Sequence, residues 1–193
     1  MQRVKIILAS QSKQRKLLMQ SLNLDFEIQP ANLDESQIQT DDQIIRAQLI
    51  AQAKAQAVAK QNPNSLVIAA DTYGLLEGKP LEKPQDINEA KEMLKAQSGQ
   101  WIQAVTGFCF VGFEGEATSG TQVTQVKFRK LLPAEIDHYV NQHPVMTWSA
   151  AFAPTYPSGA ALIEEIEGSF TGFTYGLPIE NLVPFLNHQL GLS

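Results

Sequence analysis

A carboxylate, a hydroxyl and two lysines lie close together after a strongly apolar stretch of the chain. The apolar run is residues 66–69, Asp71 and Thr72 follow it, and Lys79 and Lys83 come within a dozen residues. An acid in this place could hold a metal ion or activate water, and lysines suit phosphate groups. In open α/β sheets, ligands bind outside the carboxyl ends of the strands, where this pattern predicts Asp71. The alternative is that Asp71 only caps a turn.

A second polar group follows the short apolar run near the start of the chain. Residues 4–9 are typical of a strand, and residues 12–22 carry leucines at helical spacing. The turn between them holds Ser10 and Ser12, with Arg15 in the first turn of the helix. Backbone N–H groups at a helix start are free and carry partial positive charge. The segment from Ser10 to Arg15 is therefore predicted to bind phosphate.

A lysine lies on the apolar stripe of the next helix. We expect this helix at about residues 41–61, with Thr40 as its N-cap. Lys54 comes seven residues after Ala47 and three after Ala51, so it starts from the inward, alanine-lined side. Such a lysine either extends its ammonium out to solvent or meets an anion.

The remaining elements alternate between the two types, which predicts an α/β fold. A hairpin is expected at residues 75–81, and the D-x-x-E pattern beginning at Asp86 predicts a helix that stops near residues 98–99. Beyond it we expect strands at 104–113 and 122–130, a helix at 133–142, paired strands at 160–167 and 170–175, and a helix at 178–190. No repeat or linker interrupts this series, so residues 1–193 are expected to form one domain.

Composition and charge restrict the class of function. The 193 residues carry 15 basic and 20 acidic side chains, for a net charge of -5, which argues against a general nucleic-acid-binding surface. The single Cys109 lies in an apolar segment and is expected to be a buried hydrophobe, and the three histidines have no metal-type spacing. The N-terminal apolar run fits neither a signal peptide nor a membrane helix, so we expect a cytoplasmic protein without a membrane partner.

A series of short motifs through nearly the whole chain resembles the Maf family of nucleoside triphosphate pyrophosphatases. The matching pieces are Leu8-Ala9-Ser10-Gln11-Ser12 with Arg15, Asp34-Glu35, Lys54-Ala55, Ala70-Asp71-Thr72, Lys83-Pro84, Ser98-Gly99, Thr124-x-Val126-x-Phe128 and Gly176-Leu177-Pro178. Each piece is weakly specific by itself. Their order and spacing together carry the resemblance.

The resemblance implies a fold, a reaction and a set of site residues. The fold is a mixed, elongated α/β sheet with flanking helices in two lobes around a cleft, like that of inosine triphosphatases. The reaction is hydrolysis of a nucleoside triphosphate to the monophosphate and pyrophosphate, with a divalent cation, Mg²⁺ or Mn²⁺. A homodimer is a possible assembly. The implied triphosphate-binding residues are Ser10, Arg15, Lys54 and Lys83. Glu35 and Asp71 would hold the cation, and Asp71 would also be the base for the attacking water.

Two departures from the family pattern concern the base of the nucleotide. Gln14 stands where family members usually carry the first arginine of Ser-Pro-Arg-Arg, a position linked with nucleobase choice. Counting back from Gly159, Tyr156 stands where the family's base-reading glutamine would be. Thr72 matches the family's pyrimidine-type members, whereas Gln14 and Tyr156 match neither that subgroup nor the one favouring methylated guanine nucleotides. We therefore expect an altered base preference.

Three hypotheses follow. The first is an active pyrophosphatase with altered base preference, and the second is a nucleotide-binding module of the same fold with little or no catalysis. The third is an unrelated dinucleotide-dependent enzyme, which the absence of G-x-G-x-x-G after the first strand argues against. The presence of Glu35, Asp71 and Lys83 favours the first over the second.

Overall fold

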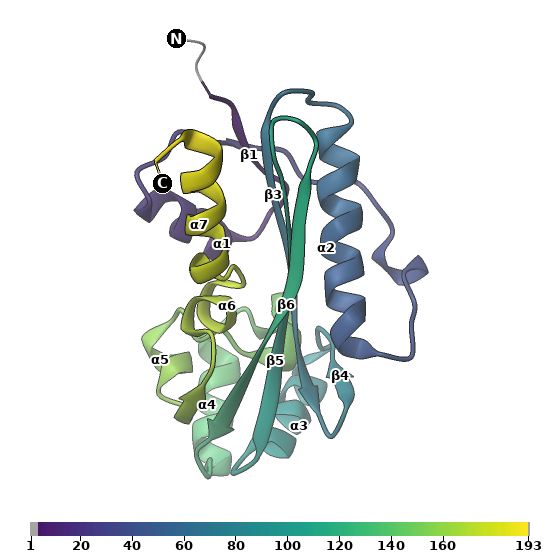
Figure 1. Cartoon of the computed structure of the whole chain (residues 1–193). Helices are drawn as coiled ribbons and strands as arrows, with labels where there is room; N and C mark the ends of the chain where they lie inside the picture. The colour runs from purple at the N-terminus through teal and green to yellow at the C-terminus, as the bar shows by residue number, and fades with distance from the viewer. Residues whose placement is uncertain (1–3, 193) are drawn as a thin grey trace.

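One mixed sheet of seven strands forms the framework of the molecule (Figure 1). The structure is a computed structural model and describes residues 4–192. The strands follow the order β2-β1-β3-β5-β6-β7, with the short β4 paired to β3 outside that path. β1 is parallel to β2 and β3, and the other pairings are antiparallel. The strands are β1 (Ile6–Leu8), β2 (Glu27–Ile28), β3 (Leu66–Leu76), β4 (Lys79–Leu81), β5 (Trp101–Val111), β6 (Ala117–Phe128) and β7 (Ile163–Glu167).

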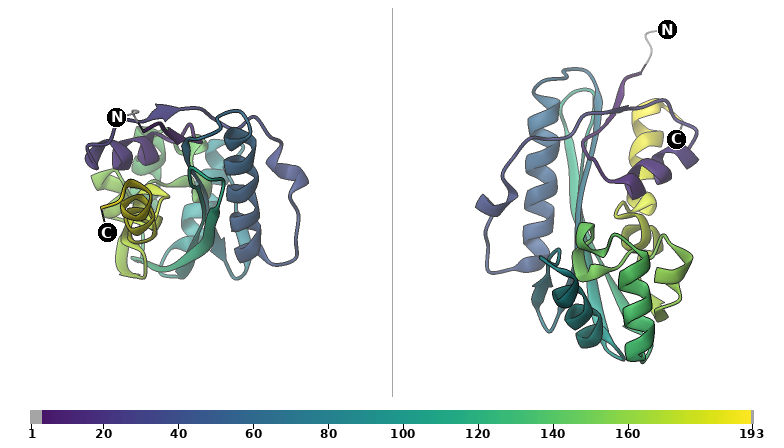
Figure 2. Two further views of the ribbon diagram at one scale, coloured as in Figure 1. Left: turned by 45° about the horizontal axis from the view of Figure 1, so that its top comes forward. Right: turned by 180° about the vertical axis from the view of Figure 1, so that it is seen from behind.

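Helices cover both faces of the sheet, with α2 on one side and α1 and α7 on the other (Figures 1 and 2). The helices are α1 (Lys13–Ser21), α2 (Gln43–Ala59), α3 (Ile87–Gln97), α4 (Pro133–Gln142), α5 (Pro157–Ala160), α6 (Phe170–Tyr175) and α7 (Ile179–Leu190). Single 3₁₀ turns are η1 (Glu35–Gln37), η2 (Val145–Thr147) and η3 (Ser149–Ala151). This arrangement confirms the mixed α/β fold class. Across residues 4–192, no helix has both the length and the apolar character needed to cross a bilayer.

The alternation of side chains along β3 divides the upper core between these helices. Val67 packs in a cluster with Ala51 of α2, whereas Ile68 packs in a cluster with Met19 of α1 and Leu182 of α7. Successive residues of a strand point to opposite faces, which explains why the apolar run is continuous. Both faces of β3 are therefore buried up to the point where the polar residues begin.

Helix α2 approaches the sheet closely because small residues face each other. A Cβ atom built on Gly107 of β5 would lie 2.1 Å from the backbone carbonyl carbon of Ala47 in α2, so no larger residue fits there. The alanines of α2 keep its axis near the strands, and this contact fixes the face of α2 that carries Lys54.

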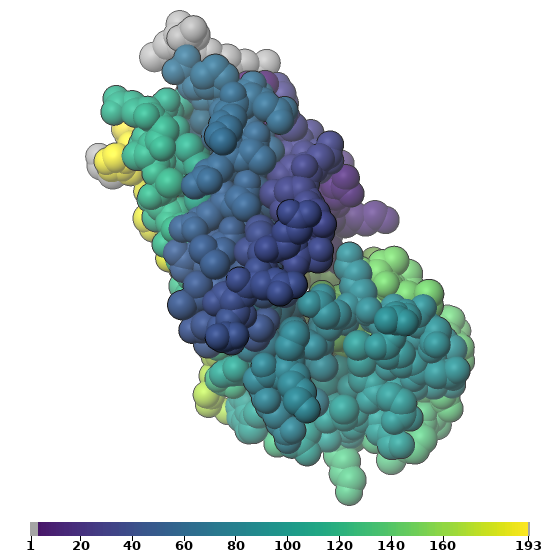
Figure 3. Space-filling view, turned by 90° about the vertical axis from the view of Figure 1, so that its right-hand side faces the viewer, coloured from purple at the N-terminus to yellow at the C-terminus, as the bar shows by residue number. Residues whose placement is uncertain are grey.

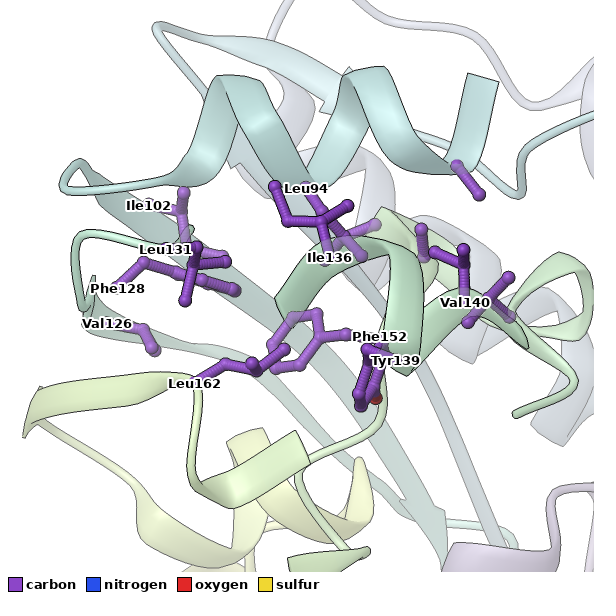
Figure 4. Packing of buried hydrophobic residues seen from close by; sticks show 14 of the residues in the cluster. Leu94, Ile102, Val126, Phe128, Leu131, Ile136, Tyr139, Val140, Phe152 and Leu162 are labelled. Carbon is purple, nitrogen blue, oxygen red and sulfur yellow. The ribbon is translucent and has the colours of Figure 1, made fainter. Parts of the chain in front are cut away.

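A second core holds the lower part of the molecule together (Figure 4). Leu94 of α3 and Ile136 of α4 pack over Phe128 of β6. The ring of Phe128 meets Phe152 edge-on, with 4.9 Å between centroids. Because Phe152 follows η3, this core anchors the irregular segment that forms one wall of the cavity described below.

The middle of β3 has no paired strand along one edge, among the residues that the structure describes. β1 pairs with β3 as far as Ile68, and β4 begins to pair with it at Gly74. Among the residues that the structure describes, positions 70–73 therefore have no strand neighbour on that side, while β5 pairs continuously on the other. This gap exposes the edge that carries Asp71 and Thr72.

Our prediction that Asp71 lies at the end of a strand was wrong. β3 continues to Leu76, and Asp71 pairs with Gly107 of β5 in the middle of the ladder. The polar residues begin where the parallel neighbour β1 ends, since its last residue, Leu8, pairs with Ile68. The loss of apolar character thus marks the end of β1 rather than the end of β3.

Two further expectations need correction. Residues 170–175 form helix α6 rather than a strand, because Ser169 Oγ accepts a hydrogen bond from the Gly172 N–H and Gly176 ends the helix with a φ of 68°. Helix α2 begins at Gln43 with Asp42, not Thr40, as its N-cap, because the Asp42 carboxylate accepts from the next free N–H groups. The other expected elements are present, with their ends shifted by a few residues.

Candidate active site

A cavity of about 860 Å³ lies at the open edge of β3. The segment after β1 forms one flank, and Glu82 and Lys83 after β4 form the other. In the space-filling view the surface is notched between the purple N-terminal residues and the teal and green lower part (Figure 3). The structure brings all the predicted site residues to this cavity: Ser10, Gln14, Arg15, Glu35, Lys54, Asp71, Thr72, Lys83 and Tyr156. Lys79, which is also near Asp71 in sequence, lies in β4 outside the cavity lining.

Lys54 joins the two carboxylates predicted to bind a cation. Its Nζ atom lies 2.8 Å from Asp71 Oδ1 and 2.8 Å from Glu35 Oε1. The Lys54 side chain is 12% exposed and that of Asp71 13%, so this contact is largely shielded from water, whereas Glu35 is more exposed. Of the two outcomes expected for Lys54, the structure shows the one in which the ammonium meets an anion.

Arg15 is buried on the other face of β3, and its side chain is bound by three segments. Its Nε donates to the Gly176 carbonyl at 2.8 Å, Nη1 donates to Ser10 Oγ at 3.0 Å, and Nη2 donates to Thr72 Oγ1 at 3.1 Å. Burial lowers the pKa of this guanidinium, while the charges of Asp71 and Glu35 act in the opposite direction. The guanidinium thus orients the two hydroxyls and supplies positive charge beside the cavity.

The start of α1 forms the flank above Arg15. Ser12 is the N-cap, and its Oγ accepts a hydrogen bond from the Arg15 N–H at 3.4 Å. The same Oγ donates a hydrogen bond to Gln14 Oε1 at 3.2 Å, which holds the Gln14 amide against the N-cap. Ser10 Oγ accepts from the Ser12 N–H at 3.1 Å, which fixes the turn between β1 and α1.

An aromatic group forms the opposite end of the cavity. Trp148 and Tyr156 both line it, with 5.1 Å between ring centroids. His143 lies behind them, 5.7 Å from the Tyr156 ring, and its Nε2 is 2.8 Å from Ser158 Oγ. This histidine packs against rings and a hydroxyl.

Arg46 and Trp148 are among the cavity residues that the sequence reasoning missed. Arg46 is detectable in retrospect because it lies eight residues before Lys54 on the same face of α2. Trp148 had no such signal, since it lies between η2 and η3 in irregular chain. With Arg46 included, the lining contains five cations (Lys13, Arg15, Arg46, Lys54, Lys83) against three carboxylates (Glu35, Asp71, Glu82), although the whole chain is acidic.

Metal-binding groups in the cavity are limited to these carboxylates. In the part of the chain that the structure describes, no group of three or more His, Cys, Asp or Glu residues could hold a metal ion. Two carboxylates that converge on one point, as Glu35 and Asp71 do on Lys54 Nζ, are the kind of donor set with which Mg²⁺ binds when phosphate oxygens supply the other ligands.

Comparison with known proteins gives a consistent result. The family model described as Maf-like protein matches residues 5–189. A dTTP/UTP pyrophosphatase of Pyrococcus furiosus is 37% identical over 188 residues, which cover 96% of this chain and 97% of that protein. A dTTP/UTP pyrophosphatase of Latilactobacillus sakei is 35% identical over 182 residues, covering 94% of this chain and 99% of that protein.

Solved structures resemble the chain in fold. The Ham1 protein of Staphylococcus aureus superposes with a TM-score of 0.56 at 16% identity, covering 95% of this chain and 98% of that one. A HAM1 protein from Coxiella burnetii gives a TM-score of 0.55 at 17% identity, covering 96% and 99%. At this level of identity the likeness concerns the fold alone.

Proposed function

The chain belongs to the Maf family, and from that membership we propose that it hydrolyses a nucleoside triphosphate to the nucleoside monophosphate and pyrophosphate. The relatives named dTTP/UTP pyrophosphatase support this activity. The observation that carries the proposal is the convergence of Lys54, Asp71 and Glu35 at the open edge of β3, with Arg15 on the other face. Such a site places an acid beside several phosphate-binding cations.

In this proposal Asp71 is the general base. A water molecule beside Asp71 transfers a proton to the carboxylate while its oxygen attacks the α-phosphorus, the one next to the nucleoside. The bond from the α-phosphorus to the bridging oxygen breaks, and pyrophosphate leaves with its electrons. Lys54 fixes the carboxylate through its 2.8 Å contact. Cations placed around the phosphates stabilise the charge that grows on the phosphoryl oxygens in the transition state.

We propose that the phosphates bind between the start of α1 and the Lys83 loop. The hydroxyls of Ser10 and Thr72 are oriented by Arg15, and the N–H groups at the start of α1 suit an anion. Lys83 lines the cavity from the other flank and provides a mobile ammonium for the phosphate chain.

We also propose dependence on Mg²⁺ or Mn²⁺. Glu35 and Asp71 fit such an ion because their carboxylate oxygens already converge on a single cation, Lys54 Nζ. Bound there, a divalent cation would supply Lewis-acid stabilisation of the phosphate oxygens. Lys54 would then remain as the neighbouring positive charge that keeps both carboxylates in place.

The base preference is proposed to differ from that of typical family members. Tyr156 is 38% exposed and lies against Trp148, so the base end offers aromatic faces in place of a bidentate amide. An aromatic face stacks on any base, whereas an amide reads a hydrogen-bonding edge. Thr72, in contrast, keeps the pyrimidine-type residue beside Asp71. The expectations of a cytoplasmic location, of no nucleic-acid partner and of a homodimer stay predictions.

The test is a panel of canonical and modified nucleoside triphosphates assayed for pyrophosphate release, with Mg²⁺, with Mn²⁺ and with a chelator. We expect release that requires the cation and favours one or several bases. Binding of nucleotide without turnover on any substrate would instead support the alternative, a nucleotide-binding module of the same fold. The departures at Gln14 and Tyr156 favour that alternative.

A further inference from the structure

Arg46 is a cationic residue of the cavity to which no sequence motif assigns a role. It lies four residues before Ile50 and eight before Lys54, so the three side chains share one face of α2, and all three line the cavity. The Arg46 side chain is 17% exposed. A charged group held this far from water needs a partner or a ligand.

The contacts of Arg46 orient the guanidinium but leave its ion pair weak. Nε donates to the Ile38 carbonyl at 3.0 Å, and the guanidinium carbon lies 5.7 Å from the centroid of the Tyr73 ring. Its nearest carboxylate is Glu82, with 3.6 Å between Nη1 and Oε1. That separation exceeds the length of a charge-assisted hydrogen bond, and the Glu82 side chain is 64% exposed. Exchanging Glu82 for another anion therefore costs little.

The position of Arg46 continues the row of charges that begins at Asp71. Asp71 and Tyr73 are two residues apart on β3 and lie on the same face, about 7 Å from each other. Lys54 lies over Asp71 and Arg46 lies over Tyr73, so the two cations follow the strand in sequence. Lys83, next to Glu82, faces the same space from the other flank.

The charge of the substrate suits a further cation at this end. Lys54 is already shared between two carboxylates, and each nitrogen of Arg15 donates to a protein oxygen. A triphosphate carries several negative charges beyond the reacting phosphorus. A planar guanidinium binds phosphate oxygens bidentately, which the compact ammonium of lysine does not do.

We propose that Arg46 binds the terminal phosphates of the substrate, the pyrophosphate half, by exchanging the Glu82 carboxylate for phosphate oxygens. This inference rests on the proposed function for the direction of the triphosphate in the cavity. Glu82 then acts as a competitor that holds Arg46 when no phosphate is bound. Removing Arg46 should therefore weaken phosphate binding, whereas removing Glu82 should not.

The experiment measures binding of inorganic tripolyphosphate and of a nucleoside monophosphate to the whole chain by calorimetry. Arg46→Gln should raise the Kd for tripolyphosphate about tenfold or more, the size expected for lost hydrogen bonds to a charged group, and leave that for the monophosphate unchanged. Glu82→Gln should leave the tripolyphosphate Kd unchanged or lower it by up to about fivefold, the range of an exposed ion pair. Arg129→Gln is the matched control, because Arg129 pairs with Glu135 at 3.0 Å outside the cavity lining.

Two results would overturn the inference. If both variants weaken tripolyphosphate binding alike, Arg46 acts by holding the Glu82 loop, and if Arg46→Gln has no effect, the phosphates do not reach it. Thermal unfolding of each variant verifies that the fold is retained, and Arg46→Lys replaces the residue if Arg46→Gln does not fold. Because binding is measured without turnover, a chain that binds tripolyphosphate through Arg46 but hydrolyses nothing would refute the proposed function while still showing that Arg46 binds phosphate.

Discussion

The two ends of the cavity are built in different ways. At the phosphate end, Arg15 connects segments that are far apart in the sequence through hydrogen bonds of 2.8 to 3.1 Å, and Lys54 connects α2 to β3. At the base end, Trp148 and Tyr156 come from one irregular stretch, and their rings pack at a tilt of 36° with 5.1 Å between centroids. Directional hydrogen bonds and an ion pair fix the first end, whereas non-directional ring contacts within one segment form the second.

This difference explains which functions tolerate change. Phosphate chemistry needs charges at fixed positions, since small displacements reduce transition-state stabilisation. A base can be bound by stacking with little dependence on position, so a change at Tyr156 should leave Asp71 undisturbed. Variants at the first end should therefore affect all substrates, and variants at the second end should affect their ranking.

The largest effect is expected for Asp71→Asn. The amide keeps the shape but loses basicity and charge, so turnover should fall by about 10² to 10⁴ while nucleotide binding stays within about tenfold. An assay of pyrophosphate release measures turnover, and calorimetry measures nucleotide binding. Asp137→Asn is a charge-matched control, because Asp137 pairs with Lys91 away from the cavity. Retention of more than about a tenth of the wild-type rate would exclude Asp71 as the base.

Next in size is Lys83→Met. Loss of a hydrogen bond to a charged phosphate costs about 1.5 to 3 kcal/mol, so kcat/KM should fall by about ten- to a hundredfold for every base tested. Lys79→Met is the matched control, since Lys79 is exposed in β4 of the same hairpin and outside the cavity lining. Equal losses in the two variants, or a loss restricted to one base, would contradict the assignment of Lys83 to the phosphates.

Arg15→Lys tests whether the phosphate end is fixed by geometry rather than by charge. Lysine keeps the charge but cannot reach Gly176, Ser10 and Thr72 together, so the free energy of unfolding should fall by about 1 to 3 kcal/mol. Denaturant unfolding measures this, with Lys13→Arg as a control at the exposed start of the same helix. Unchanged stability would show that the three hydrogen bonds contribute little.

The smallest effect is expected for Tyr156→Gln. Restoring the amide should shift the ratio of kcat/KM values toward uridine or thymidine triphosphate by about 1 to 3 kcal/mol. The lower part of this range is more consistent with a side chain that is 38% exposed. Competition assays between paired substrates measure the ratio. An unchanged profile would mean that Tyr156 lies outside the base site, although it lines the cavity.

The sequence predicted the phosphate end better than the base end for a physical reason. Lys54 and Asp71 lie on periodic elements, so the helical stripe and the apolar run located them before the fold was known. The end of β1 could not be located in this way, which misplaced Asp71 at a strand end. Arg46 shares the stripe of Lys54, but its partners Ile38 and Glu82 come from loops.

The base end lacks any periodic signal. The chain there passes through Ala150 and Ala151, both with a φ of 59°, a region that residues other than glycine rarely occupy. No sequence pattern predicts such a path, so the position of Trp148 beside Tyr156 could not be inferred. Residues 170–175 form a helix because Ser169 caps its start and Gly176 ends it, and these two local signals outweigh the strand predicted there.

The central claim is that the protein hydrolyses nucleoside triphosphates in this cavity to monophosphate and pyrophosphate. Phosphorus NMR of a reaction with uridine or thymidine triphosphate and Mg²⁺ tests it directly, because every phosphate product is seen at once. We predict equal amounts of monophosphate and pyrophosphate, with no diphosphate formed, and we expect Asp71→Asn to form these products about 10² to 10⁴ times more slowly. Formation of nucleoside diphosphate with inorganic phosphate, or an unchanged spectrum for every nucleotide that binds, would contradict the account.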